Sequence, residues 1–172
     1  MSKIKIFLML SGYQLTWVMC VFGELLYNSF IPGLLCGLLF LAICFVNSDN
    51  IKKTFQIVFF ISLIGYLFDT SLVFFEIYNF QTSLYIGVLP IWMLVLWPSF
   101  AILFDEILIF LSKFRITAVI LSSILGPLTY FAGSPLGLIN INNLFVFFIL
   151  MIIFWAILMI FYLNYILKLR FN

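Results

Sequence analysis

The stretch NSDNIKK, residues 47–53, decides the fold, because it is a short polar break between long apolar segments. It contains Lys52 and Lys53. The other basic residues form three further pairs along the chain: Lys3 with Lys5, Lys113 with Arg115, and Lys168 with Arg170. Each interval between pairs is long enough for two membrane crossings of roughly 20 residues each and a tight turn. Since basic residues beside helix ends stay in the cytoplasm, the four pairs predict six membrane-spanning helices with both termini cytoplasmic.

The composition also favours a membrane protein over a soluble domain. Of the 172 residues, 66% are apolar and 8% are charged, whereas ordinary soluble domains carry about 25% charged residues. The net charge of +2 comes without a basic patch interleaved with aromatic residues, so we expect no nucleic-acid partner. We expect an all-α, multi-pass protein with a single transmembrane domain over residues 1–172. Its expected environment is a lipid bilayer, as a homodimer or within a larger membrane complex.

Apolar runs and polar breaks place the six expected helices. They cover approximately residues 4–26, 31–46, 54–78, 88–111, 116–133 and 144–167. Two of them contain a proline beyond the first turn, where it removes a backbone hydrogen bond. Pro98 is expected to kink the fourth helix and to free a carbonyl near Leu94, and such freed groups can line a site. Pro127 follows Gly126 in the short fifth segment, which is either a continuous kinked helix or a broken one.

Histidine is absent from the chain, and the three cysteines lie in apolar segments. Without histidine there is no histidine ligand for haem or zinc, and no side chain that ordinarily titrates near neutral pH. Cys20, Cys36 and Cys44 are expected to fill the core as small soft side chains. We therefore expect neither a metal site nor a cofactor.

Asp69 is the main functional candidate, because an ionisable residue inside a membrane helix suggests a function by default. It lies roughly 22 Å into the third helix at 1.5 Å per residue, and no lysine or arginine is available at that depth. Its carboxyl is either protonated, wetted by a cavity, hydrogen-bonded to neighbouring helices or paired with a cation. The structural alternative is a neutral carboxyl that holds helices together.

Two further acids are expected near the outer end of the bundle. Glu76 follows Asp69 by two turns of the third helix, and Glu24 ends the first helix at the same level. A mouth lined by these acids would attract cations, although wetting at the interface also explains both. Gln14 and Trp17 share a helix face with Glu24. The candidates for substrate or cation binding are therefore Asp69, Glu76, Glu24, Gln14, Trp17 and Trp97, with Pro98 and Pro127 as helix kinks.

Five short motifs follow one another along the chain: Gln14-x-x-Trp17, Gly65-x-x-x-Asp69-Thr70, Pro90-x-Trp92, Leu96-Trp97-x-x-Phe100 and Gly126-Pro127-x-x-Tyr130-x-x-Gly133. In this order and spacing they resemble a family of small polytopic bacterial inner-membrane proteins known only as a domain of unknown function. One position departs from the family pattern, because Asp105-Glu106 replaces an Asn-His pair. A mechanism that used that histidine would be absent here or would run with a carboxylate. The resemblance implies fold and location and carries no activity.

Three classes of function stay open at this stage. The first is a small transporter or lipid-handling permease in which Asp69 is the coupling or cation-binding carboxyl. The second is an integral-membrane enzyme that acts on a lipid or isoprenoid-like substrate, with Asp69 or Glu76 as general acid or base. It is less favoured, since no nucleophile or metal motif is present. The third is an accessory subunit whose polar residues contact a larger complex.

Overall fold

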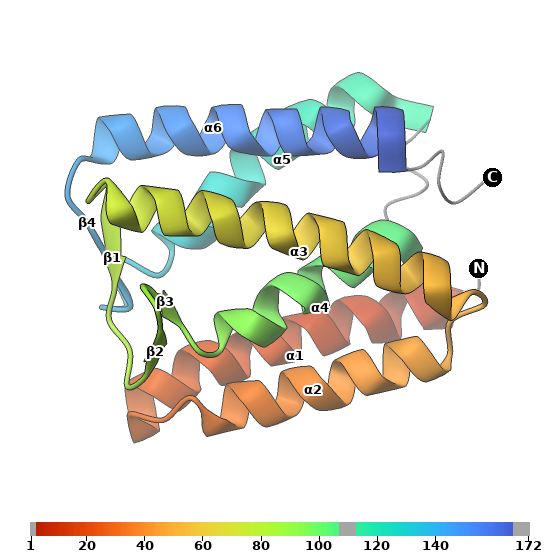
Figure 1. Cartoon of the computed structure of the whole chain (residues 1–172), viewed down its shortest axis with the longest axis horizontal. Helices are drawn as coiled ribbons and strands as arrows, with labels where there is room; N and C mark the ends of the chain where they lie inside the picture. Colours follow the sequence, from red (N-terminus) through yellow and green to blue (C-terminus); the bar gives the residue numbers. More distant parts are fainter. Residues whose placement is uncertain (1–2, 107–112, 167–172) are drawn as a thin grey trace.

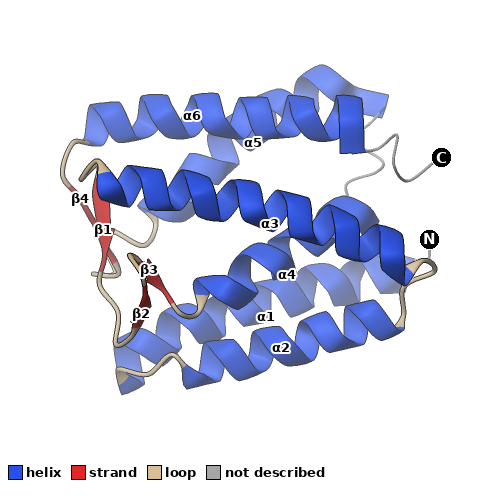
Figure 2. Cartoon of the chain, viewed as in Figure 1, coloured by secondary structure: helices blue, strands red, loops and turns tan. Residues whose placement is uncertain are grey.

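The structure is a computed structural model that describes residues 3–106 and 113–166, and these are mostly helical (Figure 2). The helices are α1 (Lys3–Tyr27), α2 (Ile31–Val46), α3 (Ile51–Phe74), α4 (Met93–Glu106), α5 (Arg115–Phe131) and α6 (Leu144–Phe161), which continues as a π-helical turn over Tyr162–Ile166. Four short strands join them: β1 (Tyr78–Phe80), β2 (Tyr85–Ile86), β3 (Leu89–Pro90) and β4 (Ile139–Ile141). The fold is thus a helical bundle with strands only between helices.

Three of the helical segments are long and apolar enough to cross a membrane: Ile4–Tyr27, Ile51–Phe74 and Leu144–Tyr165. Three more apolar helices are shorter, namely Ile31–Val46, Met93–Phe104 and Arg115–Phe131. Large apolar side chains cover the outside of the bundle, and Ile116 is 78% exposed. Such a surface is unfavourable in water and suits the hydrocarbon of a bilayer. The fold is therefore that of a membrane protein.

Consecutive helices run in opposite directions, so the start of α1 and the end of α6 lie at the same end of the bundle (Figure 1). Lys5, Lys53 and Arg115 lie in the first turns of α1, α3 and α5, and these turns are all at this end. The four strands lie at the opposite end. In the packing, α5 lies against α6 and α1 against α2, while α4 contacts α1, α2 and α3.

Two glycines allow helices to approach bulky rings. A Cβ on Gly65 of α3 would lie 2.3 Å from the indole of Trp97, and a Cβ on Gly126 of α5 would lie 2.2 Å from the indole of Trp155. Any larger residue at either position would have to displace a tryptophan. The glycines thus fix the positions of Trp97 and Trp155 inside the bundle.

The strands and their loops, residues 75–92 and 132–143, form a cap over one end of the bundle. Strand β1 pairs antiparallel with β4, in the register Tyr78 with Ile141 and Phe80 with Ile139, and β2 pairs with β3 as a hairpin. The cap joins the end of α3 to the start of α6, although these segments are far apart in the sequence.

The cap corrects two expected helix boundaries. The third helix ends at Phe74, not near residue 78, because Glu76 takes a left-handed φ of 54°. The N–H of Ile77 then returns to the carbonyl of Leu72 at 2.9 Å, a bond typical of helix C-termini. The fourth helix begins at Met93, not near residue 88. Residues 85–90 form the hairpin, and Gly87 in its turn has a φ of 63°.

Both prolines lie inside continuous helices. Helix α5 runs without a break from Arg115 to Phe131 and includes Pro127, which answers the question left open by the sequence. In α4, the missing N–H of Pro98 leaves the Leu94 carbonyl free, as expected, and the Tyr66 hydroxyl of α3 donates to it at 3.1 Å. Some of the expected features lie outside the described residues. They are residues 107–111, which were expected to end the fourth helix, the side chains of Asp105 and Glu106, and the basic pair Lys168 and Arg170.

Candidate functional site

Asp69 lies at the centre of a hydrogen-bond network that joins three helices and the cap. The Tyr78 hydroxyl donates to Oδ1 at 2.7 Å and the Trp97 Nε1 donates to Oδ2 at 2.6 Å. The Tyr130 hydroxyl lies 3.0 Å from Oδ1 and 2.9 Å from Oδ2. These donors come from β1, α4 and α5, while Asp69 itself belongs to α3. Among the four states considered from the sequence, the structure shows a carboxyl hydrogen-bonded to its neighbours.

This carboxyl is fully buried, with 0% of the residue exposed. Within residues 3–106 and 113–166, no basic side chain forms an ion pair with it. The indole N–H of Trp97 can only donate a hydrogen bond. Oδ2 of Asp69 therefore has to be the acceptor. Burial, together with the nearby Asp69 charge, raises the pKa of the Tyr78 phenol well above its ordinary value. Tyr78 therefore remains protonated and able to donate.

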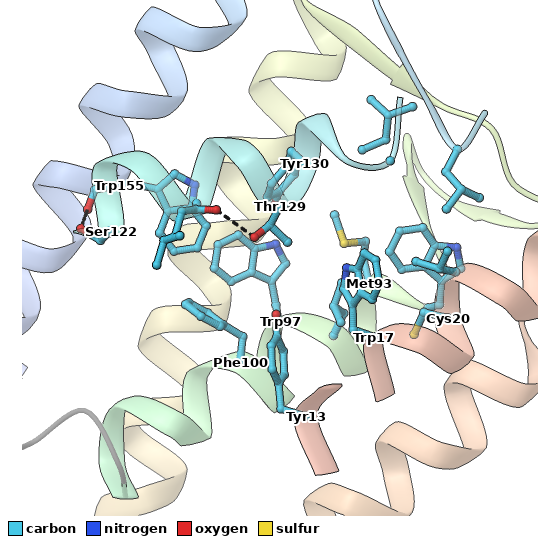
Figure 3. Close-up of a pocket in the computed structure, with 18 of the residues that line it drawn as sticks. Tyr13, Trp17, Cys20, Met93, Trp97, Phe100, Ser122, Thr129, Tyr130 and Trp155 are labelled. Atoms are coloured by element: carbon cyan, nitrogen blue, oxygen red, sulfur yellow. Dashed lines mark hydrogen bonds between the residues drawn. The ribbon is translucent and has the colours of Figure 1, made fainter. Parts of the chain in front are cut away.

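A cavity of about 300 Å³ lies beside this network (Figure 3). Helices α1, α4, α5 and α6 and the cap all contribute to its wall. Its lining is largely apolar and includes eight aromatic rings: Tyr13, Trp17, Phe80, Trp92, Trp97, Phe100, Tyr130 and Trp155. The chain has four tryptophans, and all four line this cavity. We call it the aromatic cavity.

Asp69 lies behind the wall of the aromatic cavity and does not line it. Trp97 and Tyr130 line the cavity and also donate to the carboxylate, so the wall is one side chain thick at this point. Figure 3 shows both residues at the same part of the cavity, with Trp97 rising from α4 and Tyr130 from α5. Asp69 therefore fixes the orientation of two rings that face the cavity.

Aromatic contacts hold two further rings of the cavity, Trp155 and Phe100. Trp97 stacks on Trp155 with ring centroids 5.9 Å apart and an interplanar angle of 17°. Phe100 meets Trp155 edge to face at 5.2 Å. Both arrangements are favourable for aromatic pairs. The Trp155 Nε1 is buried and has no hydrogen-bond partner in the described part of the chain.

The aromatic cavity opens along α5 towards the outside of the bundle. Leu121, Leu125 and Thr129 line it, recur every four residues on one helix face, and are themselves exposed. Leu125 is 58% exposed. The cavity is partly open, and these exposed lining residues mark where it reaches the surface. Because α5 is apolar, this opening would face lipid.

Glu24 binds the cap to the end of α1. Its carboxylate accepts from the Thr82 hydroxyl at 2.5 Å, from the Ser83 backbone N–H at 2.9 Å and from the Ser83 hydroxyl at 3.1 Å. The Trp92 Nε1 then donates to Thr82 at 3.2 Å. Glu24 is buried, with 6% of the residue exposed. Its hydrogen bonds hold the loop before the β2–β3 hairpin. Glu24 is not a member of the cavity lining.

The other candidates from the sequence are distributed differently. Trp17 and Trp97 line the aromatic cavity, whereas Gln14 is exposed and Glu76 has an exposed side chain in the turn after α3. The three acids therefore do not converge on one mouth. Pro127 lies in α5 next to Gly126, which lines the cavity. Within the described residues, no group of three or more metal-ligating side chains comes together.

A family profile matches residues 6–161, which is most of the chain. The chain belongs to the DUF2878 family. This family is described as proteins of unknown function, and the resemblance inferred from the ordered motifs is confirmed. The comparisons with curated proteins and with solved structures give no match. In this DUF2878 member, the motif residues Gly65, Asp69, Trp97 and Tyr130 meet at one place.

Tyr78, Tyr130 and Trp155 were not among the site residues expected from the sequence. Tyr130 was present only as part of a family motif, and Tyr78 was placed at the end of a helix. The sequence did contain one signal for Trp155, namely its unusual depth in the membrane. Membrane proteins concentrate tryptophan at the two interfaces, whereas Trp155 lies in the middle of the most apolar helix of this DUF2878 protein, α6.

Proposed function

We propose that this DUF2878 protein spans the bacterial inner membrane six times, with both termini in the cytoplasm. All six helices are apolar, and neighbouring helices run antiparallel. The basic residues of the first turns of α1, α3 and α5 share one end of the bundle, and basic residues beside helix ends stay in the cytoplasm. The cap then faces the opposite side.

We further propose that the protein is a small permease that takes a lipid-soluble molecule from the bilayer into the aromatic cavity. The observation that carries this proposal is the cavity itself, about 300 Å³, lined by all four tryptophans and open along α5. Ligand sites are typically concave and apolar, with a few polar groups that fix orientation. An opening on an apolar helix admits a hydrophobic molecule laterally, without passage through water.

Within this proposal Asp69 acts as a positioning residue. Its oxygens are occupied by Trp97, Tyr78 and Tyr130, and it does not line the cavity. A general acid or base has to reach the substrate, so the arrangement supports binding better than acid–base catalysis. The carboxylate acts on the ligand through the two rings that it holds.

The proposal is tested by the quenching of tryptophan fluorescence in purified protein. The probe is 1-bromo-4-neopentylbenzene, an uncharged molecule whose bromine quenches indoles on contact. Thr129→Phe places a ring at the opening, and Thr117→Phe is the matched control, because Thr117 is exposed on the same helix and does not line the cavity. We expect saturable quenching in wild type and in Thr117→Phe.

In Thr129→Phe the Kd for the probe should rise about tenfold, equivalent to about 1.4 kcal/mol. Equal quenching of all three proteins would show that the bromine reaches the tryptophans from the surrounding detergent. The cavity would then not be a binding site.

A further inference from the structure

The aromatic cavity combines two features that together indicate the charge of its ligand. The first is the density of rings, since eight aromatic side chains surround about 300 Å³. The face of an aromatic ring carries partial negative charge and attracts a cation, most strongly for tryptophan. Half of these rings are indoles. The wall of the cavity is therefore favourable for positive charge wherever a ring face is presented.

The second feature is the carboxylate behind the wall. Asp69 accepts hydrogen bonds from Trp97 Nε1 at 2.6 Å and from Tyr130 at 2.9 Å, and both rings line the cavity. A ring whose N–H or O–H donates to a carboxylate gains electron density. Trp97 and Tyr130 thus carry the negative charge of Asp69 towards the cavity while they cover its oxygens.

No positive charge of the described chain balances this arrangement. Among the described residues, the lining contains no lysine or arginine, and the basic residues lie at the opposite end of the bundle from the Asp69 network. Arg115, one turn before the lining residue Ala118, is hydrogen-bonded to Asn164. In a low-dielectric interior such a charge acts over several ångströms. A bound cation would balance the charge of the Asp69 carboxylate.

The same argument excludes other amphiphiles. An anionic headgroup would lie against aromatic faces and near a carboxylate. No lysine or arginine of the lining would neutralise its negative charge. A phosphocholine headgroup has the right ammonium, but its phosphate would lie among the same rings without a basic partner. A cation with an apolar body and no anionic group would bind the ring faces and also balance the charge of the Asp69 carboxylate.

We propose that the ligand of the aromatic cavity is a lipid-soluble organic cation, such as an aromatic quaternary ammonium ion. In this proposal the rings contact the cation, and Asp69 is its counter-ion through Trp97 and Tyr130. It rests on the proposed function, because it names the class of molecule that enters the same cavity.

The test compares two probes of the same shape in two proteins. The cation is 4-bromobenzyltrimethylammonium, and the uncharged isostere is 1-bromo-4-neopentylbenzene, in which carbon replaces the nitrogen. The proteins are wild type and Asp69→Asn, which keeps the size and one acceptor oxygen of the side chain. Because each Kd is compared between proteins, the different solubilities of the probes in detergent cancel.

We expect Asp69→Asn to raise the Kd of the cation about tenfold more than it raises the Kd of the uncharged isostere. Equal effects on both probes, or no effect on either, would overturn the inference. If the uncharged probe binds wild type and the cation does not, the inference fails while the proposed function stands. If neither probe quenches, the proposed function fails as well.

One measurement needs no variant and keeps the inference testable if Asp69→Asn does not fold. Benzyltrimethylammonium without bromine is added to wild type that is already quenched by the uncharged probe. Recovery of fluorescence is the expected result, because the two molecules would compete for one cavity. No recovery at saturating cation would overturn the inference.

Discussion

At the scale of single residues, Asp69 connects sequence to site. The sequence identified it from one argument, the cost of burying an acid in a membrane helix. It could not identify the partners, because Tyr78, Trp97 and Tyr130 are distant in the sequence and reach the carboxylate only through the tertiary fold. Gly65 belongs to the same unit, since only a glycine allows α3 to lie against the Trp97 ring.

Replacement of Asp69 by leucine should destabilise the protein strongly. Three donors would lose their acceptor, and each buried unsatisfied group costs about 1–3 kcal/mol. We expect a loss of at least about 3 kcal/mol for Asp69→Leu and a smaller loss for Asp69→Asn, which retains an acceptor oxygen. Equilibrium unfolding in detergent measures both. Equal stability of the leucine variant and wild type would show that the network contributes nothing to the fold.

At the scale of elements, the helices were more predictable than the segments between them. Long apolar runs placed six helices with the correct order, because apolar length alone determines which segments can enter a bilayer. The cap was not predicted. Its strands have two or three residues each, and β1 pairs with β4 across more than fifty positions of the sequence, so no local pattern reveals the pairing.

Glu24→Gln should loosen the loop before the β2–β3 hairpin. The variant keeps one acceptor oxygen, whereas the Glu24 carboxylate accepts from Thr82 and twice from Ser83. We expect faster hydrogen exchange at the Ser83 amide and its neighbours. Glu76→Gln is the control, because the Glu76 side chain is exposed. Unchanged exchange around Ser83 in Glu24→Gln would contradict the role of Glu24 as an anchor of the cap.

Tyr66 and Pro98 should be coupled energetically. The Tyr66 hydroxyl satisfies the Leu94 carbonyl that Pro98 leaves free, so Tyr66→Phe should cost about 1 kcal/mol. In a Pro98→Ala background, the new N–H can bond to Leu94, and the same substitution should cost less. A double-mutant cycle on unfolding free energies measures this difference. Strict additivity of the two substitutions would exclude the coupling.

At the scale of the whole molecule, the sequence places three acids towards the outer end of the bundle, where they either line one mouth or are wetted separately at the interface. The structure separates them into a buried network at Asp69, an anchor at Glu24 and an exposed side chain at Glu76. What converges instead is the set of four tryptophans. The four tryptophans come from three separate parts of the sequence, so no local sequence pattern predicts that they line one cavity.

The six-span arrangement predicts the side on which each loop is exposed. A single cysteine at Lys52→Cys should react with a membrane-impermeant thiol reagent only from the cytoplasmic side, and one at Glu76→Cys only from the other side. Both positions are exposed. The background variant lacks the natural cysteines. Labelling of both positions from the same side would contradict six crossings.

The most direct test of the central claim, that the aromatic cavity holds a ligand, is to identify what the protein retains on purification. Wild type, Thr129→Phe and Thr117→Phe are extracted from membranes in a mild detergent, and the bound small molecules are measured by mass spectrometry. We predict a lipid-soluble species that accompanies wild type and Thr117→Phe and is depleted in Thr129→Phe. The same small-molecule profile for all three proteins would contradict the claim.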